Sequence, residues 1–478
     1  MNVFRRKSRA PIPMVSQPAA DLAERPISEL AACTVIALAI AAASLIDSPR
    51  AFRAPGATWL GMITLVETGL GIGALVFTRS VSKRVFALMA PYAAFLLWAA
   101  LSTAWSPPRT EGLQNAAVFL SFLVLATVAA IAATDYRRTV ERLLRLSILV
   151  ADVIALGLVA ASIIIRGWPT NIDAVPWFVH PRSLALFGLV PLSWHLANWA
   201  RGNKRDILLA CLWVAAIFVS LSRTATASAL LLVVLASIVR AREQRDGAAR
   251  VVRSQYLMLA VVPVVVAGVL SFAPFRARLF GPTSHRDSTQ QFEMRDNGRS
   301  VMWAGVMKSA SEAPVIGKGL GSSESAVSDT YFWVGHPHND YLRVYHDLGI
   351  VGLSLLVASL GTWLVVLWRD VRRHRDDEVA AQPVLQTAAL GALLSLLLGM
   401  LTDNSLVYGF VMAPTAVLVG AGLGAQNRRL RRRRVPRATQ IEGVIGTREG
   451  DGQATPRAPD PENLPGRFLR RKRKRRRP

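Results

Sequence analysis

Long runs of apolar side chains dominate this sequence and are separated by shorter segments rich in Lys and Arg. A helix needs roughly 17–25 residues to cross a hydrocarbon core of about 30 Å. Twelve runs can do so, alone or as halves of a longer apolar stretch: 30–46, 57–77, 86–104, 113–133, 144–165, 182–200, 206–222, 224–240, 255–274, 348–368, 385–402 and 408–424. The stretch from 206 to 240 is divided because Arg223 at its centre would cost roughly 3 kcal/mol or more in hydrocarbon. The sequence thus predicts an all-α polytopic membrane protein with about 12 transmembrane helices.

The distribution of Lys and Arg predicts the orientation of these helices, because basic loops stay on the cytoplasmic side. With a cytoplasmic N-terminus, the first segment, the even-numbered connections and the C-terminal tail hold most of the 56 Lys and Arg. Both termini are therefore expected in the cytoplasm. The resulting organisation is a basic N-terminus (1–29), spans one to nine (30–274), a large, partly helical external loop (275–347), spans ten to twelve (348–424) and a polybasic tail (425–478).

The formal net charge of +25 needs no nucleic-acid partner to explain it. The tail from Ala425 carries the runs RRLRRRR and RRKRKRRR and holds too little apolar surface to fold. We expect a disordered tail that is attracted to anionic lipid headgroups. Cys33 and Cys211 both lie within predicted spans, which leaves no disulfide framework or cysteine metal cluster.

The large external loop contains one predicted helix and one glycine-rich turn. From Gly298 onwards, Arg299 and Trp303 share a face, the residues Met302, Val306 and Ala310 form an apolar stripe, and Pro314 stops the helix. We expect this helix to lie on the membrane surface. The segment GKGLG, 317–321, lacks the spacing of a nucleotide-binding loop and is interpreted as a turn.

Three of the seven histidines fall in the segment WVGHPHNDYLRVYHDLGIVGL, 333–353. Asn339 or Asp340 is a good N-cap and Gly349 a good terminator, which predicts a short helix leading into the tenth span. His338 would precede the helix N-terminus, where the helix dipole disfavours imidazolium and leaves a neutral ring able to accept a proton. The alternative is that His338 only caps or packs at a loop junction. The spacings of His336, His338 and His346 do not suit one helix face, so no metal site is predicted.

Four motifs in this region resemble the superfamily of O-antigen ligases and Wzy-type polymerases, which are bacterial envelope glycosyltransferases. They are SRT at 222–224, GRSVMW and PVIGKGLG in the loop, and HNDYLRVYHDLGIVGL before the tenth span. The His-x10-Gly pattern of that family falls on His338 and Gly349. Its loop arginine corresponds to Arg299, with Trp303 where leucine is often found, and its turn arginine corresponds to Arg223.

The resemblance implies transfer of a glycan from an undecaprenyl-pyrophosphate carrier to an acceptor sugar hydroxyl, without metal, nucleotide or other cofactor. It places the protein in a bacterial inner membrane, with the active site in the large periplasmic loop. The acceptor is either a lipid A core sugar, for a ligase, or the end of a growing carrier-linked chain, for a polymerase. Both alternatives stay open.

The residue chemistry fits a transfer of this kind. Arginine carries a permanent charge and forked donors that match phosphate oxygens, so Arg223 and Arg299 are expected to stabilise the departing pyrophosphate. His338 is expected to take the proton of the acceptor hydroxyl, in a single displacement that inverts the anomeric carbon. The expected substrate-binding residues are Asn339, Arg343, Trp303 and Lys318. Arg223 on its own also fits an arginine that reaches from a helix end to the membrane surface.

Two other classes of function compete with a transferase. A transporter or flippase of the same pathway is suggested by Glu67 and Asp152, because carboxylates within spans often mark ion paths. No internal repeat or pair of broken helices supports it. A non-catalytic scaffold would leave the His and Arg motifs without a role. The position of the essential residues separates these classes, since a transferase needs them at the outer rim and a transporter at mid-membrane.

Overall fold

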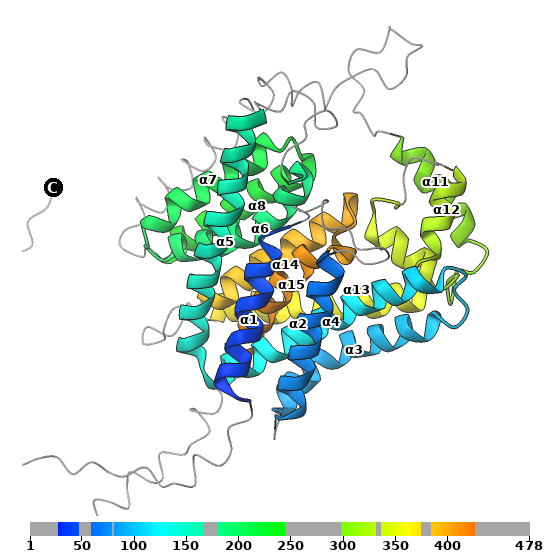
Figure 1. Cartoon of the computed structure of the whole chain (residues 1–478), viewed down its shortest axis with the longest axis horizontal. Coiled ribbons are helices and arrows are strands. Elements are labelled where there is room, and N and C mark those ends of the chain that lie inside the picture. Colours follow the sequence, from blue (N-terminus) through cyan, green and yellow to red (C-terminus); the bar gives the residue numbers. More distant parts are fainter. Residues whose placement is uncertain are drawn as a thin grey trace, which may run out of the picture. The chain divides into compact units, whose positions relative to one another are not determined.

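The structure is a computed structural model that describes residues 27–46, 59–78, 81–166, 179–243, 298–330, 336–373 and 384–425, with single helical positions at 267 and 271 (Figure 1). The described residues are helical and contain no strand. The predicted ninth span, apart from those two positions, and the polybasic tail lie outside this part of the chain.

Eleven of the predicted spans coincide with helices. These are α1 (Glu29–Ala43), α2 (Trp59–Val76), α3 (Lys83–Ser102), α4 (Arg109–Asp135), α5 (Arg137–Arg166), α6 (Pro181–Ala200), α7 (Arg205–Val219), α8 (Arg223–Glu243), α13 (Asp340–Arg373), α14 (Val384–Thr402) and α15 (Gly409–Ala425). Six of them, α3, α4, α5, α8, α13 and α14, are long and apolar enough to cross a membrane, and α1, α15 and most of α2 are shorter apolar helices. A short 3₁₀ turn, η2 (Ser405–Val407), joins α14 to α15.

The break at Arg223 that the sequence predicts is confirmed. Helix α7 ends at Val219 and α8 begins at Arg223. The three residues between them are held locally, because Ser220 Oγ accepts the backbone N–H of Ser222 at 3.2 Å and Leu221 adopts a positive φ of 56°. This turn places Arg223 at the first position of a helix.

Helix α4 packs closely against α15 in the interior of the helical assembly. A Cβ on Gly420 would lie 2.1 Å from the carbonyl oxygen of Ala126, and one on Gly424 would lie 2.0 Å from that of Ala130. Small residues let helix backbones approach in this way, which is how helices associate where lipid removes the hydrophobic driving force. In contrast, α2 and α5 expose large apolar side chains such as Leu65, Val66, Val153 and Ile164. An apolar surface of this kind suits contact with lipid.

A buried polar network joins α5, α6 and α7. His195 Nε2 lies 2.9 Å from Asp152 Oδ2, and its Nδ1 lies 2.8 Å from Asp206 Oδ1. Trp213 Nε1 donates to Asp152 Oδ1 at 2.7 Å. Burial of charged groups is tolerated when they are paired and hydrogen-bonded. The Asp152 carboxylate is therefore engaged in joining helices.

Two further helices belong to the predicted external loop, α11 (Arg299–Ala310) and α12 (Ser322–Thr330). Helix α11 follows Gly298, whose φ is 75°, and buries the predicted apolar stripe Met302, Val306 and Ala310. Met302 and Val306 form a small core with Val327 and Leu342, from α12 and α13. The predicted helix is thus confirmed, and its apolar face packs on α12 and α13, while its expected position on the membrane surface stays a prediction.

Candidate functional site

The site begins at the first turns of α13. Asn339 Oδ1 accepts the backbone N–H of Leu342 at 3.0 Å, so Asn339 is the N-cap, one of the two residues predicted for this position. The helix runs to Leu348 and is interrupted at Gly349, with φ 65° and ψ −169°, before it continues as the predicted tenth span. Gly349 therefore kinks the helix where the sequence predicted an end. The Ile350 N–H at this kink donates to the Pro314 carbonyl at 2.9 Å.

The glycine-rich segment is a turn, as predicted, and lies against the kink. Gly317, Gly319 and Gly321 all have a positive φ, and a Cβ on Gly317 would lie 2.3 Å from the Asp347 carbonyl oxygen. The turn is fastened by the Asp347 carboxylate, which accepts the backbone N–H of Gly321 at 2.8 Å and of Ser323 at 2.7 Å. Only glycine adopts such a conformation at so close an approach without strain.

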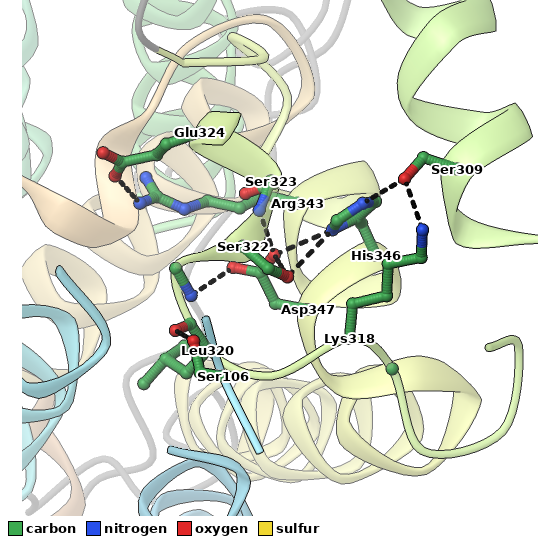
Figure 2. Close-up of polar contacts among 12 residues, drawn as sticks. Ser106, Ser309, Lys318, Leu320, Ser322, Ser323, Glu324, Arg343, His346 and Asp347 are labelled. Atoms are coloured by element: carbon green, nitrogen blue, oxygen red, sulfur yellow. Dashed lines mark hydrogen bonds and ion pairs between the residues drawn. The ribbon is translucent and has the colours of Figure 1, made fainter. Parts of the chain in front are cut away.

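Figure 2 shows how the side chains around this turn point toward one another. His346 lies between Asp347, 3.0 Å from its Nδ1, and Ser309, 3.0 Å from its Nε2. Lys318 Nζ donates to Ser309 Oγ at 3.0 Å and pairs with Glu312 at 2.6 Å. These contacts join the turn to the C-terminal part of α11.

A pocket lies where three helices begin. Three arginines line it. Arg182 is the second residue of α6, and Arg223 and Arg299 are the first residues of α8 and α11. The lining is completed by Leu221, Ser222, Thr224 and Asp403. Helix N-termini carry a partial positive charge, so three of them with three guanidinium groups make the lining of this pocket strongly positive around the Asp403 carboxylate.

Asp403, which follows α14, connects this pocket to His338. Its carboxylate lies 3.9 Å from Arg182 Nε and 3.6 Å from His338 Nδ1. Burial by itself would raise the pKa of Asp403, but contact with the His338 ring and the charge of Arg182 hold it below its ordinary value. A charged carboxylate is thus retained between the pocket and the histidine.

Asn404 and Trp303 fix the backbone around His338. Asn404 Oδ1 accepts the His338 N–H at 3.0 Å, and Asn404 Nδ2 lies 3.0 Å from His338 Nδ1. Trp303 Nε1 donates to the Pro337 carbonyl at 2.7 Å. His338 itself has a φ of 48°, a conformation that is uncommon for a residue other than glycine and is found disproportionately at functional sites. The ring position is therefore determined by contacts from α11 and from the α14–α15 connection.

The structure brings together some of the predicted residues and separates others. Arg223 and Arg299 line one pocket, and His338 adjoins it through Asp403. Arg343 is buried and pairs with Glu324 at 2.7 Å. Burial raises the pKa of Glu324, yet the His336 hydrogen bond and the Arg343 charge bring it below its usual range. The polar groups of Asn339, Trp303 and Lys318 also bond within the protein.

Sequence reasoning missed Arg182, Asp403 and Asn404 as site residues. Arg182 is the first residue of the predicted sixth span, and Asp403 and Asn404 follow the predicted eleventh span in the segment TDNS. Asn404 lies 66 positions from His338, and no local pattern links the two. One sequence pattern could have indicated these residues: they lie at the ends of apolar runs that the predicted topology places on the same side of the membrane.

Comparison with protein families gives one match. Residues 207–357 match the family model described as O-antigen ligase, a range that holds Arg223, Arg299, His338 and Gly349. Arg182, Asp403 and Asn404 lie outside the matched range. A comparison with curated proteins gave no match. The family match confirms the resemblance that the sequence motifs indicated, and with the apolar helices it indicates a membrane protein.

Proposed function

From the O-antigen ligase domain at residues 207–357, we propose that this protein is a membrane glycosyltransferase that moves a glycan from an undecaprenyl-pyrophosphate carrier to a sugar hydroxyl. In this reaction the acceptor oxygen forms a bond to the anomeric carbon and the bond from that carbon to the phosphate oxygen breaks. The carrier pyrophosphate leaves with the bonding electron pair. The hydroxyl proton passes to a base.

The observation that carries the proposal is the convergence of Arg182, Arg223 and Arg299 at three helix N-termini. The leaving pyrophosphate gains negative charge as the glycosidic bond breaks. Fixed donors aimed at developing charge stabilise a transition state because they need no reorganisation during the reaction. Asp403 holds Arg182 in place and adjoins the imidazole of His338 at the edge of the site.

The transporter alternative was based on two carboxylates within spans. Asp152 is bonded to His195 and Trp213 and joins three helices, whereas Glu67 is buried within α2. The arginine pocket lies at helix ends, where a transferase needs it. We place this end on the periplasmic side of a bacterial inner membrane, from the distribution of Lys and Arg. The acceptor is a lipid A core sugar or a growing carrier-linked chain, and the basic tail contacts anionic lipid.

The test is complementation of a deletion strain, followed by gel analysis of lipopolysaccharide and secreted polysaccharide. Arg299→Gln and Arg223→Gln remove one guanidinium each and are expected to lower transfer by roughly 10²-fold or more, as loss of a transition-state donor does. Arg205→Gln is a matched control because Arg205 is exposed at the start of α7.

The expected result is accumulation of carrier-linked glycan in the two pocket variants at wild-type levels of membrane-inserted protein. The control should give the wild-type glycan profile. The accumulating species distinguishes a ligase, which leaves long unligated chains, from a polymerase, which leaves single repeat units. Normal glycan from both pocket variants would refute the proposed function.

A further inference from the structure

An exposed apolar turn joins α11 to the glycine-rich segment. Pro314, Val315 and Ile316 are all exposed, and the accessible fraction is 56% for Val315 and 48% for Ile316. Turns that face water are mostly built from glycine, proline and small polar residues. The charged residues that flank this turn, Glu312 and Lys318, pair with each other at 2.6 Å. The tip of the turn therefore presents two adjacent branched apolar side chains and no charge.

The turn lies beside the point where α13 continues as a membrane span. The Ile350 N–H donates to the Pro314 carbonyl at 2.9 Å, and Ile350 directly follows the kink at Gly349. Ile350 is itself 48% exposed, and Val357 and Val365 are exposed further along the same helix. The apolar turn is thus continuous with the exposed apolar side of α13.

The length of α13 places the turn at the outer boundary of the hydrocarbon core. From Ile350 the helix is uninterrupted as far as Arg369, a rise of about 28 Å at about 1.5 Å per residue. A hydrocarbon core is about 30 Å thick. Arg369 is exposed and follows Trp368, and the guanidinium of Arg372 lies 4.9 Å from the centre of that ring. Tryptophan and arginine together mark a membrane interface. With these residues at the cytoplasmic interface, Ile350 lies at the outer one.

Helix α3 gives the same depth independently. It rises about 27 Å from Lys83, its first residue, to Leu101, which is 54% exposed. Trp105 lies just beyond this outer end, and its Nε1 donates to the Gly317 carbonyl at 3.3 Å. Tryptophan is enriched at membrane interfaces. A second span therefore places the turn at the outer edge of the hydrocarbon.

We propose that Val315 and Ile316 insert into the acyl chains of the outer leaflet and anchor the C-terminal end of α11 to the membrane. Phospholipid is the partner because the turn continues the exposed apolar sides of α3 and α13 at the depth where the hydrocarbon begins. A protein partner would have to bind at that boundary in competition with lipid. Arg299, at the other end of α11, lines the arginine pocket, so the anchor sets the height of α11 above the membrane. The inference does not depend on the proposed reaction.

The test is depth-dependent fluorescence quenching of the full-length protein in lipid nanodiscs. Its two cysteines are removed as Cys33→Ala and Cys211→Ala, and a single new cysteine carries the environment-sensitive fluorophore NBD. Ile316→Cys reports on the turn. Ser325→Cys is the control for water, because Ser325 is exposed on the polar helix α12. Val357→Cys is the control for the span, about 10 Å deeper than Ile350 at about 1.5 Å per residue.

The nanodisc lipids carry a nitroxide either near the carbonyl or near the methyl end of the acyl chain. The probe at Ile316→Cys should show blue-shifted emission and be quenched more strongly by the shallow nitroxide than by the deep one. The probe at Val357→Cys should show the reverse preference. The probe at Ser325→Cys should emit as it does in water, and iodide in the buffer should quench it.

Two results would overturn the proposal. One is quenching of the Ile316→Cys probe by iodide to the same extent as the Ser325→Cys probe, because the turn then faces water. The other is blue-shifted emission that neither nitroxide quenches, because protein then covers the turn.

A second measurement uses the protein without substitutions, and it decides the matter when a cysteine variant does not fold. Nanodisc phospholipid with a photoreactive diazirine in its acyl chain is activated by light, and the adducts are located by mass spectrometry. Adducts should form at residues 314–316 as well as on the exposed side of α13. Adducts on α13 without any at 314–316 would show that the turn does not enter the leaflet.

Discussion

Gly349→Ala should destabilise the protein strongly, because the kink at this position admits no side chain. The backbone has φ 65° and ψ −169°, a combination that is essentially restricted to glycine. A Cβ here would lie 2.1 Å from the Val315 carbonyl oxygen and 2.7 Å from the Gly317 nitrogen. Both obstacles are backbone atoms, so the clash cannot be relieved by rotation of a side chain.

The cost can be estimated from these contacts. A residue held in such a backbone conformation costs about 1–3 kcal/mol. Relief of the clash separates α13 from the 314–317 segment and breaks two backbone hydrogen bonds, from Ile350 to Pro314 at 2.9 Å and from Val351 to Val315 at 3.4 Å. At about 1 kcal/mol for each bond, the expected loss of unfolding free energy is about 3–5 kcal/mol.

The assay is unfolding of the purified protein by titration with a denaturing detergent. The matched control is Gly361→Ala, in the same helix, where an added Cβ meets nothing within 4 Å. The control should change stability by about 1 kcal/mol or less, since alanine is a better helix former than glycine. Equal stability of the two variants would refute the argument that the kink requires glycine.

Two further predictions concern buried polar networks. His195→Ala leaves the carboxylates of Asp152 and Asp206 buried without their shared partner and should lower the unfolding free energy by about 3–5 kcal/mol. The control His336→Ala, at a half-exposed position, should lower the unfolding free energy far less. Similar losses for the two variants in the same denaturation assay would contradict this prediction. Asp347→Ala removes the acceptor of the Gly321 and Ser323 N–H groups and should lower the unfolding free energy by about 1–3 kcal/mol for each buried donor. Hydrogen exchange at residues 317–323 should become faster, and unchanged exchange there would show that the turn does not depend on this carboxylate.

Much of the fold could be predicted from local sequence. The lengths of the apolar runs predicted the helices, and the cost of burying Arg223 predicted the break between α7 and α8. The stripe of Met302, Val306 and Ala310 predicted α11 and its buried face. The capping ability of Asn339 predicted the start of α13. These features are determined within a few turns of chain, by side-chain polarity and backbone preference.

The sequence predicted the positions and partners of the site residues less completely than it predicted the helices. Arg223 and Arg299 were chosen for their charge, and the tertiary structure placed both in one pocket. Arg343 and Lys318 were predicted to bind substrate, yet both pair with carboxylates of the protein. A sequence shows that a side chain is charged, but its partner is determined by chain packing.

The sequence by itself determined where helices form and which faces are apolar, because both depend on residues close together in the chain. Only the tertiary structure decided that Arg182, Asp403 and Asn404 join the site. The physical reason is that the pocket is built from the ends of helices that are far apart in the chain. Their convergence depends on close packing between such helices, for example of Gly391 in α14 against Ser193 in α6 and Leu232 in α8, and no local pattern contains that information.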